Sequence, residues 1–340
     1  MNKERPLISV IIPIFNIDRY ISKCLLSVSE QSLNNNLFEV ILVDDNSTDN
    51  SPQIINHCCK NKTNFKSITN QRQLGIGPAR NAGIRESKGQ FLFFIDGDDY
   101  IAERALEVML SIAQSTKADI VTSGFNRVNK DGEIKFSRND YLSMSDYKED
   151  MLCEFFSQQL TSTAWGKLYK KSLFIDNDII YPAGIHEDIS VTFKLFWFAN
   201  KIHKVSENLY YWVERDTSTT ALMTNDHIAG LLNGINLQIK FIEQIQDFKS
   251  KKRLSSSINQ GYLSAISYLL KGIKQIKRNE PKTREGLYLY LYQQIDSFPN
   301  AREIIKTNEE DFPIVYNFFI GFSTTKDKIE AMVNFESSYV

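Results

Sequence analysis

The stretch FLFFIDGDDY, residues 91–100, joins a run of apolar residues directly to a cluster of acidic ones. An uninterrupted apolar run of this kind is typical of a β-strand that is buried on both faces. Asp96, Asp98 and Asp99 follow the run, and Gly97 is the spacer inside the cluster. Because three carboxylates repel one another, their place at the end of a buried strand indicates a binding role. A divalent cation with oxygen ligands would neutralise them.

Strands and helices alternate through the first half of the chain. The apolar runs LISVIIPIF (7–15) and FEVILVDD (38–45) predict two further buried strands, and a weaker strand is predicted near 66–69. Between the strands, apolar residues recur at intervals of three and four, which predicts amphipathic helices. The first helix follows Asp18, which we expect near its N-cap. The helices are expected after Asp18, through about residue 60, and over ARNAGIRESK (79–88). This alternation predicts a mostly parallel, open α/β sheet flanked by helices.

The pattern changes in the second half of the chain. We expect a helix at 102–115, a strand at 118–125, a hairpin turn at NKDGE (129–133), a polar helix at 145–158 and an apolar helix at 188–199. His203 is expected in a strand. From about residue 226 the pattern is helical only. We therefore predict two domains, residues 1–225 and an all-helical domain of residues 226–340.

The helical domain is basic and carries an apolar stripe. Residues 249–284 hold ten Lys or Arg and one acid, Glu280. The stripe repeats at helical spacing through Tyr262, Ile266, Leu269, Ile273 and Ile276. Such a stripe must be buried against something, and a second copy of the chain in a symmetric homodimer is the cover we expect. The basic residues suggest contact with an anionic membrane surface as a second role.

Composition excludes several classes of protein. A formal net charge of −1 gives no indication of nucleic-acid binding, and 42% hydrophobic residues indicate a folded core. The four cysteines have no spacing that suggests a disulfide framework or a zinc site. No long apolar stretch resembles a signal peptide or a membrane span. We therefore expect a cytoplasmic protein, with contact at the inner face of the plasma membrane as the second role.

Three of the predicted strands end in segments that carry polar residues. The segments are Pro13–Asn16, Asp44–Ser47 and Asp96–Asp99. Ligands bind beyond the carboxyl ends of the strands in open α/β sheets, so these three segments are expected to form one site. Carboxylate oxygens suit Mg2+ or Mn2+, and phosphate groups of a substrate commonly complete the coordination shell. An acidic pair alone is also a common turn sequence, so the prediction depends on the alignment of the three strand ends.

The segment GIGPAR, residues 75–80, argues against a dinucleotide enzyme. Its two glycines have G-x-G spacing, but Arg80 stands where the third glycine is needed, and no acid follows at the distance of a ribose-binding residue. Arg80 and the helix it lies on could instead stabilise a diphosphate. A structural brace is an equally good interpretation of Arg80 at this point.

Six motifs together resemble glycosyltransferase family 2. They are ISVIIPIFN, VILVDDNSTDNS, QLGIGPARNAGIRESKGQFLFFIDGDD, TAWGKLYKKSLF, GIHEDISVTFKLFWFA and LYYWVERDTSTT, which occur in this order between residues 7 and 220. The resemblance implies the GT-A fold in residues 1–225 and transfer of a sugar, with inversion, from a nucleotide-sugar donor. It does not extend to the helical domain.

The resemblance implies a donor site at the strand ends. Pro13, Phe15 and Asp45 are expected around the nucleobase, with Asp45 accepting from uracil N3–H. Asn16 and Gly97 belong to the same strand-end motifs and are assigned to the donor with them. The remaining donor residues contact the phosphates, ribose or metal ion: Arg80, Asp96, Arg215 and Ser218, with Asp98 as the main metal ligand.

The resemblance also implies an acceptor side. Asp188 is the expected base, and Glu187 its neighbour; capping of the following helix is the alternative role of Asp188. Trp165 and Lys167 are expected beside the acceptor, although Trp165 could equally be a core residue. His186 is a candidate third metal ligand with Asp98 and Asp96, and an ordinary loop histidine is the alternative. Asp99 could support the metal site through hydrogen bonds.

The function expected from these residues is metal-dependent hexosyl transfer. The donor would be UDP-galactose, UDP-glucose or a UDP-N-acetylhexosamine, with Mn2+ or Mg2+. The acceptor would be a hydroxyl of a bacterial surface polysaccharide, a lipid-linked glycan or a glycoprotein glycan. One alternative is a sugar-1-phosphate nucleotidyltransferase, although residues 8–20 lack the glycine-rich loop that such enzymes need. A non-catalytic module that binds a sugar nucleotide or a glycan is the other.

Overall fold

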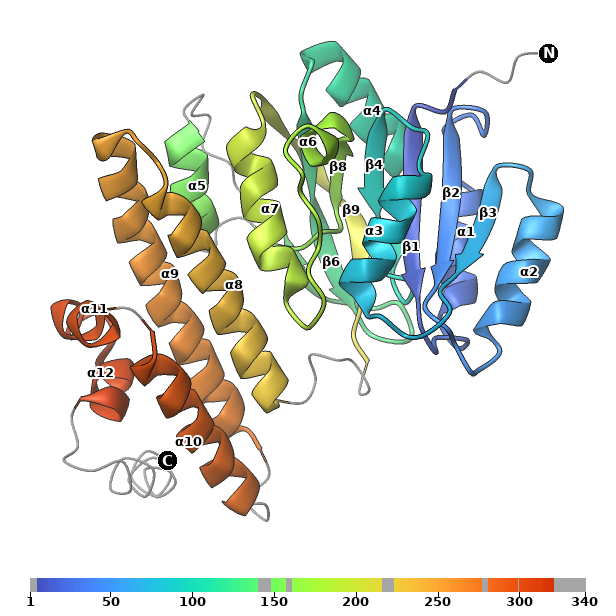
Figure 1. The fold of residues 1–340 in the computed structure, drawn as a ribbon. Helices are drawn as coiled ribbons and strands as arrows, with labels where there is room; N and C mark the ends of the chain where they lie inside the picture. Colours follow the sequence, from blue (N-terminus) through green and yellow to red (C-terminus); the bar gives the residue numbers. More distant parts are fainter. Residues whose placement is uncertain are drawn as a thin grey trace. The chain divides into compact units, whose positions relative to one another are not determined.

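The computed structural model describes residues 5–139, 148–156, 161–215, 223–276, 281–298 and 300–320. The chain forms two compact units. The first consists of residues 1–155 and 159–216, and the second of residues 156–158 and 217–340. Figure 1 shows the first unit as an α/β sheet with helices and the second as helices. Ser218 lies outside the described residues.

The first unit is built on one mixed sheet. Among the described residues the strand order is β3-β2-β1-β4-β8-β6-β9-β5, and β7 pairs with β6. The four strands from β3 to β4 are parallel, as predicted for the first half of the chain. Their bounds are β1 Ile8–Ile14, β2 Phe38–Asp44, β3 Phe65–Thr69 and β4 Phe91–Phe94.

The other half of the sheet is antiparallel except for one parallel pair, β6 with β9. The predicted hairpin at residues 129–133 joins β6 to β7. His203 lies in a strand, as predicted. The strand bounds are β5 Tyr100–Ile101, β6 Ile120–Val128, β7 Ile134–Arg138, β8 Lys167–Lys170 and β9 Ile202–Val213.

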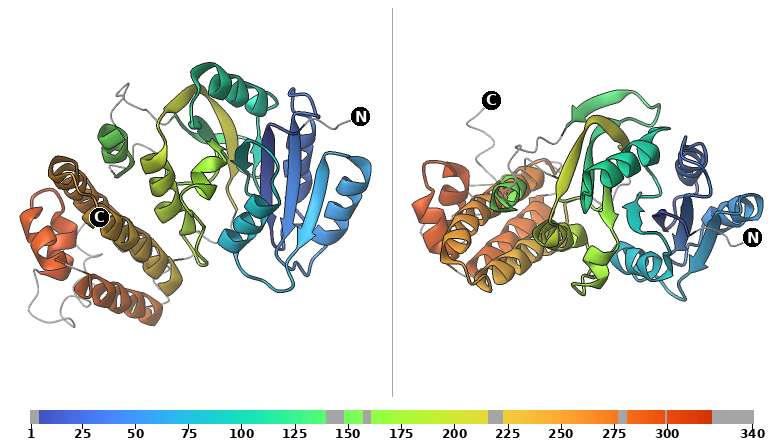
Figure 2. Two further views of the ribbon diagram at one scale, coloured as in Figure 1. Left: turned by 45° about the horizontal axis from the view of Figure 1, so that its top comes forward. Right: turned by 90° about the horizontal axis from the view of Figure 1, so that it is seen from above.

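Helices cover both faces of the parallel strands, which explains their continuous apolar sequences. Val10 and Ile12 belong to a core cluster with residues of α1 and α4, whereas Ile11 meets α3 at Gly83 on the other face. Figure 2 shows the sheet between these helices. The helices of this unit are α1 Ile21–Ser29, α2 Ser51–Asn61, α3 Ile76–Glu86, α4 Ala105–Thr116, α5 Lys148–Phe156, α6 Ser172–Ile175 and α7 Glu187–Phe198.

One predicted helix start is confirmed and another is wrong. Asp18 lies near the N-cap of α1, as predicted, and the N-cap itself is Tyr20. The Asp18 carboxylate accepts a hydrogen bond of 3.1 Å from Asn50 Nδ2, so it links two strand-end loops. Helix α3 begins at Ile76, three residues before the predicted start, because Gly75 takes a positive φ of 95° and turns the chain into the helix.

The second unit consists of helices throughout its described residues. These are α8 Asn225–Glu243, α9 Phe248–Lys274, α10 Pro281–Asp296, α11 Ala301–Thr307 and α12 Pro313–Phe319. The side chains of Thr224 and Asp247 cap α8 and α9 by accepting from backbone N–H groups. None of the described helices combines the length and the apolar character that a membrane span requires.

The apolar stripe of α9 is buried within the chain. Tyr262, Ile266, Leu269 and Ile273 are fully buried, and the Tyr262 ring stacks on Phe298 with 4.0 Å between centroids. Helices α8, α10 and α12 contact α9. The expectation that the stripe needs a second copy of the chain to cover it is therefore wrong, because the unit's own helices supply the cover.

We expect Leu269→Ala to destabilise the helical unit by about 2–5 kcal/mol, because it removes buried methyl groups and leaves a cavity. Tyr268→Ala, one residue away and 52% exposed, is the matched control and should change stability little. Urea denaturation followed by circular dichroism measures both variants. Equal stability of the two variants would contradict burial of Leu269 in the core of the helical unit.

Candidate functional site

The loops after β1 and β2 are joined by hydrogen bonds. Asn16 takes a left-handed conformation with φ of 51°. Its side-chain oxygen accepts from the backbone N–H of Thr48 at 2.8 Å, and its own N–H donates to Ser47 Oγ at 3.1 Å. Phe15, beside it, is 38% exposed, whereas Pro13 is buried. Two of the three predicted strand-end segments therefore form one connected edge.

Asp45 anchors the loop that leads into α3. Its buried carboxylate accepts from Asn70 Nδ2 at 2.7 Å, from Leu74 N at 3.0 Å and from Gly75 N at 2.7 Å. Three donors thus already hold this carboxylate in place. The residue predicted to face a nucleobase also fixes the entrance of the helix that carries Arg80.

The third strand-end segment passes close to the first. A Cβ on Gly97 would lie 2.4 Å from Ile17 Cδ1 and 3.1 Å from the Pro13 carbonyl oxygen. Only glycine fits there without displacing the end of β1. The spacer of the D-G-D-D turn is therefore what lets the acidic cluster lie against the loop after β1.

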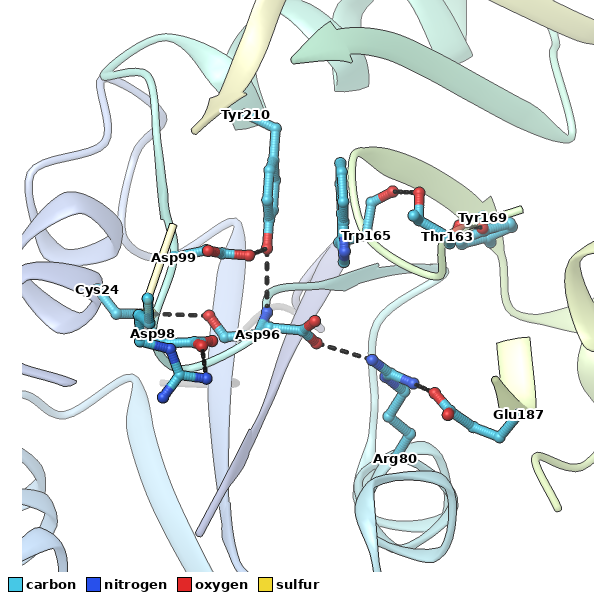
Figure 3. Close-up of polar contacts among 11 residues, drawn as sticks. Cys24, Arg80, Asp96, Asp98, Asp99, Thr163, Trp165, Tyr169, Glu187 and Tyr210 are labelled. Carbon is cyan, nitrogen blue, oxygen red and sulfur yellow. Dashed lines mark hydrogen bonds and ion pairs between the residues drawn. The ribbon is translucent and has the colours of Figure 1, made fainter. Parts of the chain in front are cut away.

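Arg80 joins the two acidic motifs of the chain. Its Nη2 donates to Asp96 Oδ1 at 2.7 Å, and its Nη1 pairs with Glu187 Oε1. Figure 3 shows the guanidinium between the two carboxylates. Arg80 is 1% exposed and its guanidinium carbon lies 5.4 Å from the centroid of the Tyr181 ring. Residues 91 positions apart in sequence, Asp96 and Glu187, are thus held together by one side chain.

The charge of Arg80 is set by these partners. Burial alone would lower the pKa of the guanidinium, but Asp96 and Glu187 raise it well above its ordinary value. A buried charge is tolerable when it is paired and hydrogen-bonded on both sides. The cation is therefore permanent, and both interpretations of Arg80, brace and site residue, fit its position.

A close approach of backbones makes this contact possible. A Cβ on Gly77 would lie 2.0 Å from the Pro182 carbonyl oxygen and 3.2 Å from Glu187 Cγ. Helix α3 can pack against the loop before α7 only because residue 77 is glycine. The two glycines of GIGPAR therefore serve helix entry and packing, which agrees with the rejection of a dinucleotide site.

Asp98 pairs with the second arginine of the site, Arg215. The two side chains are 17% and 15% exposed. The pKa of Asp98 is raised to about 6, because burial and the neighbouring Asp96 raise it by more than Arg215 lowers it. Burial of the Asp98 carboxylate therefore outweighs the stabilisation that Arg215 gives to its charged form.

Asp99 binds strand β9 to the acidic turn. Its carboxylate accepts from Tyr210 Oη at 2.6 Å and from Val213 N at 2.8 Å. The same Tyr210 Oη accepts from the backbone N–H of Asp96 at 3.2 Å. Burial, Asp98 and Asp96 raise the pKa of Asp99. Asp99 thus holds the turn and the strand end together.

Helix α7 begins at the H-E-D motif. His186 is its N-cap residue in a left-handed conformation with φ of 60°, and Glu187 and Asp188 form the first turn. Asp188 lies in the first turn and is not the N-cap residue, so N-capping is not its role. Burial raises the pKa of Asp188 to about 7, Glu187 and Asp96 raise it too, and Arg80 and Lys167 lower it. A carboxyl group with this pKa can exchange a proton near neutral pH.

Trp165 and Lys167 lie in the interior. Trp165 is 9% exposed and stacks on the Tyr210 ring, with centroids 4.3 Å apart. Lys167 is 1% exposed, and its Nζ donates to Thr163 O and Thr161 Oγ1, both at 2.9 Å. Both residues therefore support the wall of the site, and contact with an acceptor stays a prediction.

A metal ion at the acidic turn could be bound by two carboxylates, those of Asp96 and Asp98. Among the described residues, no three His, Cys, Asp or Glu side chains form a group that could hold a metal ion, so Asp96, Asp98 and His186 do not gather into one. Two carboxylates of one turn still suit Mg2+ or Mn2+ when phosphate oxygens complete the shell.

Sequence reasoning missed Tyr210 and Gly77. Tyr210 is fully buried and connects Asp99, Asp96 and Trp165. Tyr210 lies within LYYWV, a run of mostly apolar residues in a strand, and this position suggests only a core residue. The sequence presents Gly77 only as one of the two glycines in the G-x-G spacing of a dinucleotide pattern. Neither residue carries a sequence signal for its role, because each role depends on a segment more than 100 positions away.

Comparisons with known proteins identify the family of this chain. Residues 9–177 match the family model described as glycosyl transferase family 2. The putative glycosyltransferase EpsH of Bacillus subtilis is 30% identical over 214 residues, which are 62% of this chain and 61% of that protein. The chain thus spans less than two thirds of that relative's length. The poly(ribitol-phosphate) beta-N-acetylglucosaminyltransferase TarS of Staphylococcus aureus is 31% identical over 212 residues, which are 61% of this chain and 35% of TarS.

Solved structures support the fold over nearly the whole chain. The crystal structure of TarS 1–349 in complex with UDP-GlcNAc has a TM-score of 0.72 at 22% identity and covers 98% of this chain and 91% of that one. The mannosyltransferase PcManGT of Pyrobaculum calidifontis, in complex with GDP-Man and Mn2+, has a TM-score of 0.50 at 15% identity and covers 98% and 88%. The predicted GT-A fold with a C-terminal helical addition is confirmed.

We expect Arg80→Met to destabilise the first unit, because it leaves the buried Glu187 and the partly buried Asp96 without their cation. Removing one partner of a buried pair costs about 3–5 kcal/mol, which lowers Tm by roughly 6–20 °C in a domain of this size. Arg85→Met, an exposed arginine on the same helix, is the matched control. Differential scanning calorimetry measures both variants. Equal Tm values would show that Arg80 is not the brace that its contacts indicate.

Proposed function

We propose that this chain, which belongs to glycosyltransferase family 2, transfers a hexose with inversion from a UDP-sugar to a hydroxyl group of a bacterial surface glycan. The observation that carries the proposal is the Arg80 bridge between Asp96 and Glu187. This bridge holds two acidic segments together. The turn with Asp96 and Asp98 suits a metal-bound diphosphate, and the start of α7 with Asp188 suits a base. A transferase of this kind needs the two groups on opposite sides of one anomeric carbon.

The nucleotide would lie along the edge formed by the first two strand ends. Phe15 offers an exposed ring there, and Pro13, Asn16 and Asp45 form the adjoining surface. Asp45 is oriented by donors from Asn70, Leu74 and Gly75, which favours a fixed acceptor for uracil N3–H. A preorganised carboxylate loses little entropy when it binds a base. Ser218 is proposed to lie near the diphosphate with Arg215.

Asp98 and Asp96 would hold Mn2+ or Mg2+, with phosphate oxygens of the donor completing the shell. When bound, the ion would neutralise charge on the departing diphosphate. Arg215 would contribute a second positive charge on the same side, and Gly97 would let the turn approach the phosphates. Arg80 keeps Asp96 oriented from the opposite side.

Asp188 is proposed as the base. Its carboxylate would take the proton from the acceptor hydroxyl as that oxygen attacks the anomeric carbon. The bond between this carbon and the diphosphate oxygen breaks, and its electron pair leaves with the diphosphate. Glu187 is paired with Arg80 and would raise the proton affinity of Asp188 without acting on the acceptor. Trp165 and Lys167 would shape the acceptor side from the interior.

The sugar and the acceptor are proposed from the relatives' names. TarS is named as an N-acetylglucosaminyltransferase of poly(ribitol-phosphate), and a structure of it contains UDP-GlcNAc. An N-acetylhexosamine is therefore our first choice among the hexoses, ahead of glucose and galactose. A cytoplasmic location, a homodimer and contact with the inner face of the plasma membrane remain proposals, the last supported by the ten basic residues of 249–284.

We expect slow, Mn2+-dependent hydrolysis of one UDP-sugar in a screen of donors, because water can replace the acceptor. Calorimetry should show that Mn2+ strengthens UDP binding by roughly 5- to 150-fold, the usual range for coupled ligands. Asp98→Ala should abolish this gain. Asp131→Ala, an exposed acid of the 129–133 turn, is the control. Equal UDP affinity with chelator and with Mn2+ would overturn the metal proposal.

We expect Asp188→Asn to lower transfer by roughly 10²- to 10⁴-fold, because the amide cannot accept the proton. UDP binding should persist. Since the base works only when deprotonated, and its pKa is raised to about 7, wild-type kcat/KM should fall as the pH drops below about 7. The residual activity of the variant should lack this fall. Asp226→Asn, in the first turn of α8, controls for loss of a negative charge at a helix N-terminus. Full turnover in Asp188→Asn would place the base elsewhere.

A further inference from the structure

Asp98, the proposed main metal ligand, already pairs with a positively charged side chain, Arg215. Arg215 Nη2 pairs with Asp98 Oδ2, and both side chains are largely buried. The Arg215 guanidinium also lies over the Tyr20 ring, with 5.0 Å from its central carbon to the ring centroid. Buried charge pairs are stronger than surface pairs because less water screens them. In this conformation Arg215 occupies the position of a counter-ion at Asp98.

The chain delivers Arg215 to this position from a fixed strand end. Val213 N donates to Asp99 at 2.8 Å, and Glu214 N donates to Val128 O at 2.8 Å. The residues immediately before Arg215 are therefore bonded to the acidic turn itself and to β6. The backbone of Arg215 is thereby kept within reach of the turn.

Arg215 and a divalent cation are in conflict at Asp98. Both are positive, and the guanidinium already takes one of the two carboxylate oxygens. A diphosphate beside the turn would give the guanidinium another partner, because arginine pairs with phosphate oxygens through two parallel N–H donors. Arg215 can then release Asp98 without becoming an unpaired buried charge.

We infer that Arg215 is the resident counter-cation of Asp98 and exchanges places with the divalent cation when a diphosphate binds. This inference rests on the proposed function, because it requires a nucleotide diphosphate at this turn. Without the diphosphate, Arg215 opposes the metal ion; without the metal ion, Asp98 holds Arg215 away from the phosphates. Each ligand therefore removes an obstacle to the other, and by linkage the two effects are equal. The metal ion and the donor bind as a coupled pair.

Arg215→Gln tests this exchange, since it keeps a polar side chain and removes the charge. We expect its affinity for Mn2+ alone to rise by roughly 5- to 150-fold over wild type, the range typical of such coupling. The enhancement of UDP binding by Mn2+ should become smaller. Free Mn2+ is followed by electron paramagnetic resonance and UDP by calorimetry, so neither readout needs turnover. Scanning calorimetry checks that the variant is folded.

Two further variants complete the experiment. Arg215→Lys restores a positive charge and should return the affinity for Mn2+ alone to the wild-type value. Arg127→Gln breaks the neighbouring pair of Arg127 with Glu214 and leaves Asp98 untouched, so it should behave as wild type. Unchanged or weaker Mn2+ binding in Arg215→Gln would overturn the exchange. If Mn2+ and UDP show no coupling in the wild-type protein, the proposed function fails as well, and the two failures are thereby distinguished.

Discussion

The candidate site depends on the buried guanidinium of Arg80. Its two carboxylate partners come from the end of β4 and the start of α7, and each would repel the other without it. Desolvation of three charged groups is costly, so the arrangement is stable only while all three are present and paired. Asp45 fixes the loop before α3, and Gly77 lets α3 approach Pro182. These contacts set the position of Arg80, and Arg80 sets the spacing of the two acidic motifs.

Excess negative charge gives the site its chemistry. The site has five carboxylates. Arg80 pairs with Asp96 and Glu187, Arg215 pairs with Asp98, and Arg80 and Lys167 lower the pKa of Asp188. Burial and mutual repulsion raise the pKa of Asp98 to about 6 and of Asp188 to about 7. The same deficit of positive charge therefore suits one carboxylate to a divalent cation and the other to proton transfer. Asp99 takes a different part, because Tyr210 and Val213 use its carboxylate to join β9 to the turn.

The helical unit has a separate basis for its stability. Its core is the stripe of α9, which α8, α10 and α12 cover. Amphipathic spacing predicted correctly that the stripe is buried, but it could not distinguish burial by the same chain from burial by a second copy. Periodicity defines an apolar face and carries no information about the surface opposite it.

Local pattern determined much of this protein. Continuous apolar runs predicted the parallel strands, and polar residues after them predicted which sheet edge carries the site, because burial on both faces and the direction of parallel strands follow from sequence. Six motifs identified the family. Tertiary structure alone decided that Arg80 bridges Asp96 and Glu187, that Tyr210 lies between Asp99 and Asp96, and that Trp165 packs inside. These contacts join segments up to about a hundred residues apart. The charge and size of a side chain do not determine its partner, because the partner depends on which distant segment the fold places next to it.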